Sequence, residues 1–116
     1  MKSIGDEFEL RAARWLSQRG LRLQQRNFSS AVGEIDIIAW DGPQLVFIEV
    51  RARSHPAFAG AAASVSRGKQ ARILRTAALY LQQNKLSDVP CRFDVVAFEP
   101  RQSGAEINWI RSAFTA

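Results

Sequence analysis

The sequence predicts a single α/β domain of the α+β type, in which helices flank a mixed central β-sheet. The 116 residues are 47% apolar and 23% charged, which is the balance of a globular domain large enough to bury a core. Two segments carry apolar residues at helical spacing, and five shorter segments are rich in β-branched or alternating apolar residues. The expected order is therefore α-β-β-β-α-β-β, in one domain that spans residues 1–116.

The first expected helix covers residues 4–19. Ser3 is a suitable N-cap, and Gly20 provides a stop signal after the last turn. The residues at helical spacing form one apolar stripe, which comprises Ile4, Phe8, Ala12, Trp15 and Leu16. The helix is therefore expected to bury one face.

Three strands are expected to follow this helix. Residues 21–28 alternate weakly and predict an edge strand, whereas residues 33–40 are rich in β-branched side chains. Residues 44–51 are apolar enough for a central strand. Because only the turn at 41–43 separates the last two strands, they are expected to pair as an antiparallel hairpin.

The second half begins with an expected loop at residues 54–63, which contain Pro, Gly and several Ala. Ser66 is the expected N-cap of a second helix that reaches Asn84. Strands are expected at 91–98 and, at the sheet edge, at 106–114. This order predicts a three-stranded meander, a crossover helix and two returning strands.

The net charge of +5 is unevenly distributed along the chain. Residues 50–87 contain no Asp or Glu but seven Lys or Arg, whereas the acidic residues lie on either side of them. A basic face attracts polyanions, of which nucleic-acid backbones are the commonest. The alternative is a solvated helix face in an arginine-rich chain. The charge pattern favours nucleic acid as the partner.

The composition excludes several kinds of site. Cys91 is the only cysteine and His55 the only histidine, which excludes an internal disulfide, a cysteine-based zinc site and a multi-histidine metal site. We expect Cys91 in the core and His55 in a loop. Residues 1–10 carry three acids where a signal peptide needs an apolar run, and no apolar stretch approaches the length of a membrane span. A soluble cytoplasmic protein is therefore expected, with no membrane partner.

Two carboxylates interrupt the apolar strands, Asp36 in the second strand and Glu49 in the third. A buried charge is costly unless it is paired or binds a metal. Because strand side chains alternate, Glu49 and Arg51 share a face, and antiparallel pairing would bring Asp36 within about 5 Å of Glu49. Hard oxygen ligands at this spacing suit Mg²⁺ or Mn²⁺. The alternative is an ion-pair network in which Arg51 or Arg53 holds the acids.

The helices add further candidates. Glu9 has no basic partner at i+3 or i+4, so it either leans over the sheet or is exposed in the first turn. Gln70 falls within the apolar stripe of the second helix, where it either orients a phosphate, water or carboxylate, or satisfies the backbone. Lys69 and Arg67 can reach a phosphate. For Asp94 we favour pairing with an arginine.

Four motifs form a combination that is more specific than any one of them. They are Gly33-Glu34-Ile35-Asp36, Phe47-Ile48-Glu49-Val50-Arg51-Ala52-Arg53, Val65-Ser66-Arg67-Gly68-Lys69-Gln70 and Arg92-Phe93-Asp94-Val95. With Gly5, Glu9, Ala12 and Leu16, the combination resembles the YraN-type endonuclease-like bacterial family. That family is classed by fold with the PD-(D/E)xK nuclease superfamily and is called Holliday-junction-resolvase-related. The resemblance implies a restriction-endonuclease-like core.

The resemblance also implies roles for individual residues. Asp36 and Glu49 would bind Mg²⁺ or Mn²⁺, Val50 would contribute its backbone carbonyl, and Glu9 would bind the metal directly or through water. Gln70 would match the polar residue of the following helix. Arg51 departs from the pattern, which usually has lysine at this position. Arginine can hold a phosphate and stabilise charge, but it cannot act as a base.

The leading hypothesis is metal-dependent hydrolysis of phosphodiester bonds in DNA, in preference to RNA, with branched or structured DNA as a candidate substrate. The expected nucleic-acid contacts are Arg53, Arg67, Lys69, Arg72 and Arg75. The alternative is a catalytically weak or inactive nucleic-acid-binding module on the same fold. A third hypothesis is a domain whose basic face docks an acidic protein. A homodimer is implied only by analogy with resolvases.

Overall fold

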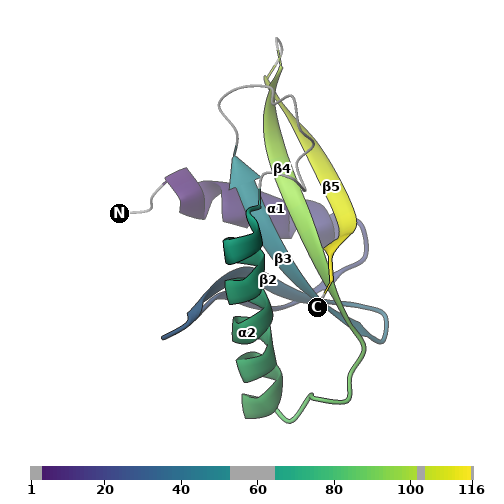
Figure 1. Ribbon diagram of the computed structural model, residues 1–116. Coiled ribbons are helices and arrows are strands. Elements are labelled where there is room, and N and C mark those ends of the chain that lie inside the picture. The colour runs from purple at the N-terminus through teal and green to yellow at the C-terminus, as the bar shows by residue number, and fades with distance from the viewer. Residues whose placement is uncertain (1–3, 53–64, 102–103, 116) are drawn as a thin grey trace.

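The computed structural model describes residues 4–52, 65–101 and 104–115 (Figure 1). The order of elements is the predicted one, and the expected loop at 54–63 lies outside the described residues. The elements are α1 (Ile4–Gln18), β1 (Arg22–Ser30), β2 (Gly33–Asp41), β3 (Gln44–Ala52), α2 (Arg67–Gln83), β4 (Cys91–Arg101) and β5 (Gly104–Phe114).

The five strands form one mixed sheet in the order β1-β2-β3-β4-β5. Antiparallel pairing joins β1 to β2, β2 to β3, and β4 to β5, whereas β3 and β4 are parallel. A parallel pair needs a crossover connection, and α2 supplies it. The predicted hairpin, the central position of β3 and the edge positions of β1 and β5 are confirmed.

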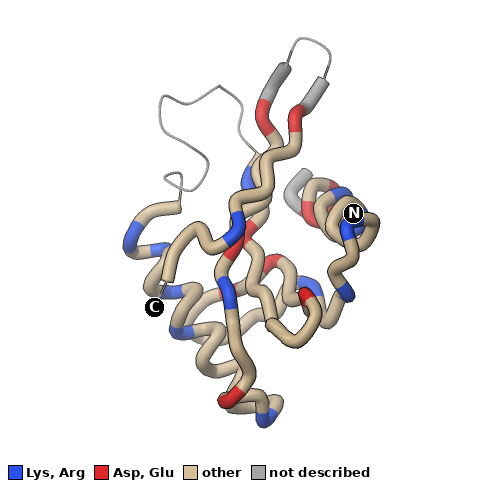
Figure 2. The backbone as a smooth tube through the Cα atoms, turned by 90° about the vertical axis from the view of Figure 1, so that its right-hand side faces the viewer, with Lys and Arg blue, Asp and Glu red and all other residues tan. Residues whose placement is uncertain are grey.

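The two helices cover opposite faces of the sheet (Figures 1 and 2). Because strand side chains alternate between faces, each helix packs on its own set of apolar residues. The core under α2 includes Ile38, Leu45, Phe47, Ile73, Ala77, Tyr80 and Val95. The core under α1 includes Ala12, Leu16, Ile37, Ala39, Val46, Ile48, Val96 and Phe98. In the apolar stripe predicted for the first helix, Ala12 and Leu16 are buried as expected, and Phe8 and Trp15 are partly buried against the same core, whereas the side chain of Ile4 lies outside the described part of the chain.

The ends of α2 follow the sequence signals. The Ser66 side chain accepts a hydrogen bond from the Lys69 N–H at 3.2 Å, which satisfies one of the free donors of the first turn. Asn84 caps the other end. This capping fixes where the helix begins, and Lys69 therefore lies in its first turn, at the end of the helix nearest the C-terminal end of β3 (Figure 1).

No helix within the described ranges is both long and apolar enough to cross a membrane.

Candidate active site

The site begins where β2 and β3 separate. Their pairing runs from Asp41 opposite Gln44 to Ile37 opposite Ile48. Beyond this last pair, the Val50 N–H donates to Asp36 Oδ2 at 2.8 Å, so a carboxylate replaces the backbone acceptor of the neighbouring strand.

Continued by one residue, this register would set Asp36 opposite Glu49, and a hydrogen bond joins the two side chains. The predicted convergence of these two acids is confirmed. Glu49 is only 5% exposed, and Asp36 is half-buried. Burial and, second, the charge of Glu49 raise the pKa of Asp36 to about 8, although the Val50 N–H acts to lower it. At neutral pH the pair therefore retains a proton that it would lose in water.

Lys69 reaches this pair from α2. Its Nζ lies 2.7 Å from Glu49 Oε1, and its side chain is 36% exposed. The ammonium thus neutralises Glu49 from the solvent side of the site. From the sequence, Lys69 is predicted only to reach a phosphate. The signal that could have identified its contact is the first-turn position of the lysine, facing a strand carboxylate that needs a cation.

Glu9 lies close enough to the pair to interact with it electrostatically. Burial raises the pKa of Glu9, while Arg26 acts to lower it and Asp6, Glu34 and Glu49 act to raise it. Its Oε1 atom is buried, and no donor within the described ranges reaches it. Nevertheless, within those ranges no three His, Cys, Asp or Glu side chains are placed to hold one metal ion together. The structure therefore brings Asp36 and Glu49 together, with Glu9 outside their immediate contact.

The remaining candidates lie around the pair. The Gln70 amide donates to the Val65 carbonyl at 2.9 Å, which is the backbone-satisfying arrangement that we considered as an alternative. Val50 contacts Asp36 through its N–H, and its side chain packs on the α1 side of the sheet. Arg51 is half-buried near the end of β3. Arg53 lies outside the described residues.

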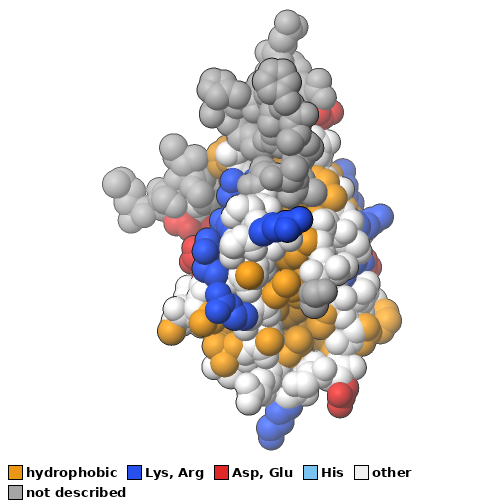
Figure 3. Space-filling model, in the orientation of Figure 1, with side chains coloured by type: hydrophobic (Ala, Val, Ile, Leu, Met, Phe, Trp, Pro, Cys, Tyr) orange, Lys and Arg blue, Asp and Glu red, His pale blue; other side chains and the backbone are white. Residues whose placement is uncertain are grey.

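Basic residues line the outside of α2. Arg67, Arg72 and Arg75 are exposed, and Figure 3 shows Lys and Arg side chains gathered on the face that carries this helix. A hollow of about 220 Å³ lies between α2 and the start of β2, lined by Gly33, Glu34, Lys69, Arg72 and Ile73. Because Lys69 also contacts Glu49, this hollow opens directly beside the acidic pair.

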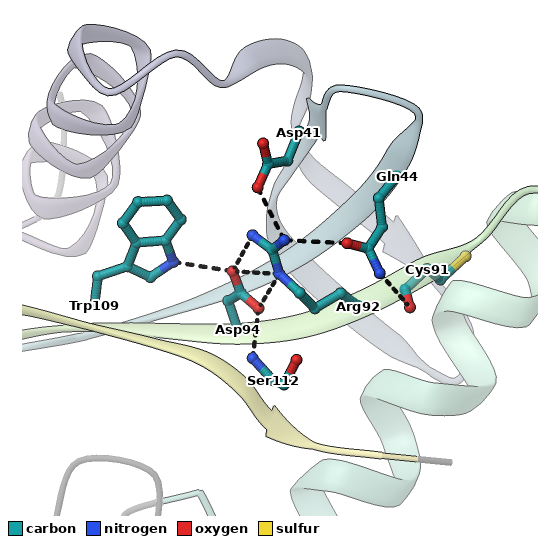
Figure 4. Close-up of polar contacts among 7 residues, drawn as sticks. All are labelled: Asp41, Gln44, Cys91, Arg92, Asp94, Trp109 and Ser112. Atoms are coloured by element: carbon teal, nitrogen blue, oxygen red, sulfur yellow. Dashed lines mark hydrogen bonds and ion pairs between the residues drawn. The ribbon is translucent and has the colours of Figure 1, made fainter.

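A second buried carboxylate, Asp94, belongs to a polar network on the α1 face (Figure 4). Arg92 Nε lies 2.9 Å from Asp94 Oδ1, and the Trp109 indole N–H and the Ser112 N–H each donate to the carboxylate at 2.9 Å. Arg92 also binds Asp41 at 2.9 Å. The expected pairing of Asp94 with an arginine is confirmed, and the network ties β4 to β5 and to the β2–β3 turn.

The pKa of Asp36 predicts how stability depends on pH in a metal-chelating buffer. Below about pH 4 both the folded and the unfolded carboxyl are protonated. Between about 4 and 8 the unfolded chain has released this proton and the folded chain has not, so the free energy of unfolding falls as pH rises, by at most about 1.4 kcal/mol per unit. Urea unfolding across this range measures the slope. Asp36→Asn should flatten it, and an unchanged slope in that variant would contradict the assignment.

Comparison with known proteins places the chain among a large group of similar sequences. The model of UPF0102, described as an uncharacterised protein family, matches residues 8–98. A UPF0102 protein of Enterobacter sp. (strain 638) is 49% identical over 115 residues, which cover 97% of this chain and 85% of that protein. The UPF0102 proteins YraN of Escherichia coli (strain SE11) and Salmonella newport (strain SL254) are 47% and 48% identical over the same shares. The similarity thus extends over nearly the whole chain.

Proposed function

The chain belongs to the uncharacterised protein family UPF0102, and we propose that it is a divalent-metal-dependent nuclease that hydrolyses phosphodiester bonds in DNA. The observation that carries the proposal is the pair of strand carboxylates, Asp36 and Glu49, beside a basic helix. The mixed sheet with a helix on each face supports the further proposal of a restriction-endonuclease-like core.

The acidic pair fits a divalent cation. Burial and the neighbouring charge of Glu49 make Asp36 retain a proton. A bound cation would stabilise both carboxylates as anions. Oxygen donors of this kind suit Mg²⁺ or Mn²⁺. Asp36 and Glu49 would hold the ion, and the proposal adds Glu9, directly or through water, and the Val50 carbonyl. Bound there, Mg²⁺ would polarise a phosphoryl oxygen and lower the pKa of its water.

Lys69 and Arg51 supply the positive charge of the site in this proposal. The Lys69 ammonium lies against Glu49 and can exchange a proton, whereas a guanidinium keeps its proton. We therefore assign to Lys69 the proton-handling role that Arg51 cannot perform. Arg51 would hold the phosphate bidentately. Gln70, whose amide binds the Val65 carbonyl, would fix the approach of α2 to the site and keep its oxygen toward water or phosphate.

The DNA strand would reach the acidic pair along α2. The contacts that we propose are Arg67, Lys69, Arg72 and Arg75 on the helix and Arg53 beyond β3. The hollow beside Gly33 and Lys69 has room for a phosphate and its sugar. Branched or otherwise structured DNA remains the candidate substrate, and the proposed homodimer would present two such sites to two strands.

A nucleic-acid-binding module is the second candidate. The contact between Lys69 and Glu49 favours it, because an ammonium at 2.7 Å already neutralises one acid without a metal ion. Such a module would bind DNA with a steep salt dependence, and it would not need a divalent cation.

Calorimetric titration of the DNA-free protein with Mn²⁺ tests the metal site. We expect saturable Mn²⁺ binding at neutral pH. Binding should release a proton, because Asp36 must lose its proton to bind the ion. Comparison of buffers with different ionisation enthalpies measures this proton release. Asp36→Asn and Glu49→Gln should abolish the binding. Asp88→Asn, which changes an exposed acid between α2 and β4, is the control and should bind normally. Absence of Mn²⁺ binding to the unsubstituted chain would favour the binding module.

Substitution of Lys69 tests its assigned role. Lys69→Ala is expected to reduce metal-dependent DNA cleavage about a hundredfold, because proton transfer and charge stabilisation by a placed side chain contribute at this scale. Lys69→Arg should keep the ion pair with Glu49 and DNA binding but recover little activity. Single-turnover rates at saturating DNA measure the effect. Full activity in Lys69→Arg would show that only positive charge is needed at this position.

A further inference from the structure

Three arginines on the α1 side of the molecule lie over aromatic rings. The Arg19 guanidinium carbon is 3.6 Å from the centre of the Trp15 ring, and that of Arg111 is 3.9 Å from the centre of the Trp109 ring. Arg11 lies 5.0 Å above the Phe98 ring. We call Arg11, Arg19 and Arg111 the arginine row. Its members come from α1 and β5, away from the basic face of α2.

The row is continuous because of helix and strand periodicity. Arg11 and Trp15 are four residues apart and share one side of α1, and Arg19, which directly follows the end of the helix, stacks on Trp15. Trp109 and Arg111 are two residues apart on β5 and share one face of that strand. The Trp15 and Trp109 rings meet edge to face, with their centres 5.9 Å apart, and this contact joins the two halves.

The rings hold the row in place. The Trp109 indole donates to the fully buried Asp94 at 2.9 Å, which fixes the ring beneath Arg111 (Figure 4). Arg19 is held additionally by a hydrogen bond of 3.2 Å from Nη1 to the Trp15 carbonyl. A guanidinium stacked on a ring keeps its in-plane N–H groups available, and it loses less conformational freedom when it binds an anion.

The positive charge of the row bears on which partner it would bind. Within the described ranges, no carboxylate forms an ion pair with Arg11, Arg19 or Arg111. Arg11 and Arg19, the second of which directly follows α1, are separated by about 12 Å along the direction of the helix axis, a length over which one strand of a duplex presents three or four phosphates along the duplex axis. Glu9, which interacts electrostatically with Asp36 and Glu49, lies on the same helix just before Arg11.

We propose that the arginine row is a second nucleic-acid contact, which binds backbone phosphates of the strand as it passes from the acidic pair along α1. The inference rests on the proposed function, which supplies the nucleic acid. Bidentate guanidinium donors match phosphate oxygens. Because the guanidinium groups already cover the Trp15 and Trp109 rings, the row contacts phosphates and does not stack bases.

DNA binding in EDTA isolates this contact from catalysis. The double variant Arg19→Gln and Arg111→Gln would be titrated against a fluorescein-labelled single-stranded oligonucleotide and its duplex over a series of salt concentrations. We expect about tenfold weaker binding, and a salt slope that falls by about one for each arginine removed. Lys85→Gln, which removes an exposed charge beyond the far end of α2, is the control and should leave the slope unchanged. Arg11→Gln added to the double variant should lower the slope again.

A second readout places the contact at the row. Trp40 lies elsewhere, with its indole bonded to Gln24, so Trp40→Phe leaves Trp15 and Trp109 as the only tryptophans. Their fluorescence should change on DNA binding in this background.

The outcomes separate this proposal from the proposed nuclease function. If the double variant binds DNA as tightly as the unsubstituted chain, the arginine row is not a DNA contact. Metal-dependent cleavage by the unsubstituted chain would still support the nuclease function in that case. If the double variant binds DNA more weakly and neither it nor the unsubstituted chain cleaves DNA, the result would support the arginine row as a DNA contact and contradict the nuclease function. No binding of either oligonucleotide at low salt would overturn the row.

Discussion

The substitution Asp36→Asn is expected to abolish metal-dependent DNA cleavage and, at the same time, to stabilise the metal-free fold. Cleavage should fall by at least about a thousandfold, because an amide at this position leaves the metal with one charged ligand fewer. The fold should gain stability near pH 7, because asparagine can still accept the Val50 N–H bond but does not need to retain a proton beside Glu49.

Single-turnover cleavage and thermal unfolding in EDTA measure the two effects on one preparation. For a domain of this size, 1 kcal/mol shifts Tm by about 4 °C, so the stabilisation is readily observed. Asp88→Asn, which changes an exposed acid between α2 and β4, is the control and should change neither quantity. Loss of both activity and stability in Asp36→Asn would mean that the carboxylate is structural and that the site assignment is wrong.

The substitution Asp94→Ala is expected to destabilise the fold by about 3–5 kcal/mol, because it removes the partner of a mostly buried arginine. Arg92 would keep Asp41 and Gln44 but lose its bidentate partner. The Trp109 indole and the Ser112 N–H would also lose their acceptor. The connection between β4 and β5 depends on these bonds, so the loss is expected to affect the whole sheet.

Urea unfolding at neutral pH measures this loss. Asp94→Asn keeps the shape and part of the hydrogen bonding and should cost less than Asp94→Ala. Asp88→Ala changes an exposed aspartate before β4 and should stay within about 0.5 kcal/mol of the unsubstituted chain. A similar stability for Asp94→Ala and Asp88→Ala would show that the network in Figure 4 contributes little to folding.

Local sequence signals predicted the elements well, since each signal acts within a few residues. Ser66 and Asn84 cap the two ends of α2 as expected, and the short connection at Gly42 produces the hairpin between β2 and β3. The convergence of Asp36 and Glu49 also followed from the sequence, because the hairpin register and the alternation of side chains are local properties. Three strands extend clearly further than predicted: β1 ends at Ser30 and not at Phe28, and β4 and β5 extend toward each other to Arg101 and Gly104.

Contacts between distant segments could not be predicted in the same way. The first-turn position of Lys69 makes a contact with Glu49 possible, but whether its flexible side chain reaches Glu49 depends on how α2 crosses the sheet. The separation of β2 and β3 at Asp36 is equally a tertiary effect, in which a side chain replaces a strand acceptor. Trp15 belongs to the predicted apolar stripe and packs against the core, as Trp109 does, but the stacking of Arg19 and Arg111 on these two rings depends on the meeting of α1 and β5.

The central claim is that Asp36 and Glu49 support metal-dependent cleavage of DNA. The most direct measurement is the cleavage of end-labelled single-stranded, duplex, flap and four-way-junction DNA, each with Mg²⁺, Mn²⁺ or EDTA. Asp36→Ala, purified in parallel, controls for a contaminating nuclease. We predict cutting that requires the metal, is lost in Asp36→Ala, and shows by its preferred substrate which DNA structure the site accepts. Salt-sensitive binding of the same DNA without any metal-dependent cutting would contradict the claim and would indicate a nucleic-acid-binding module.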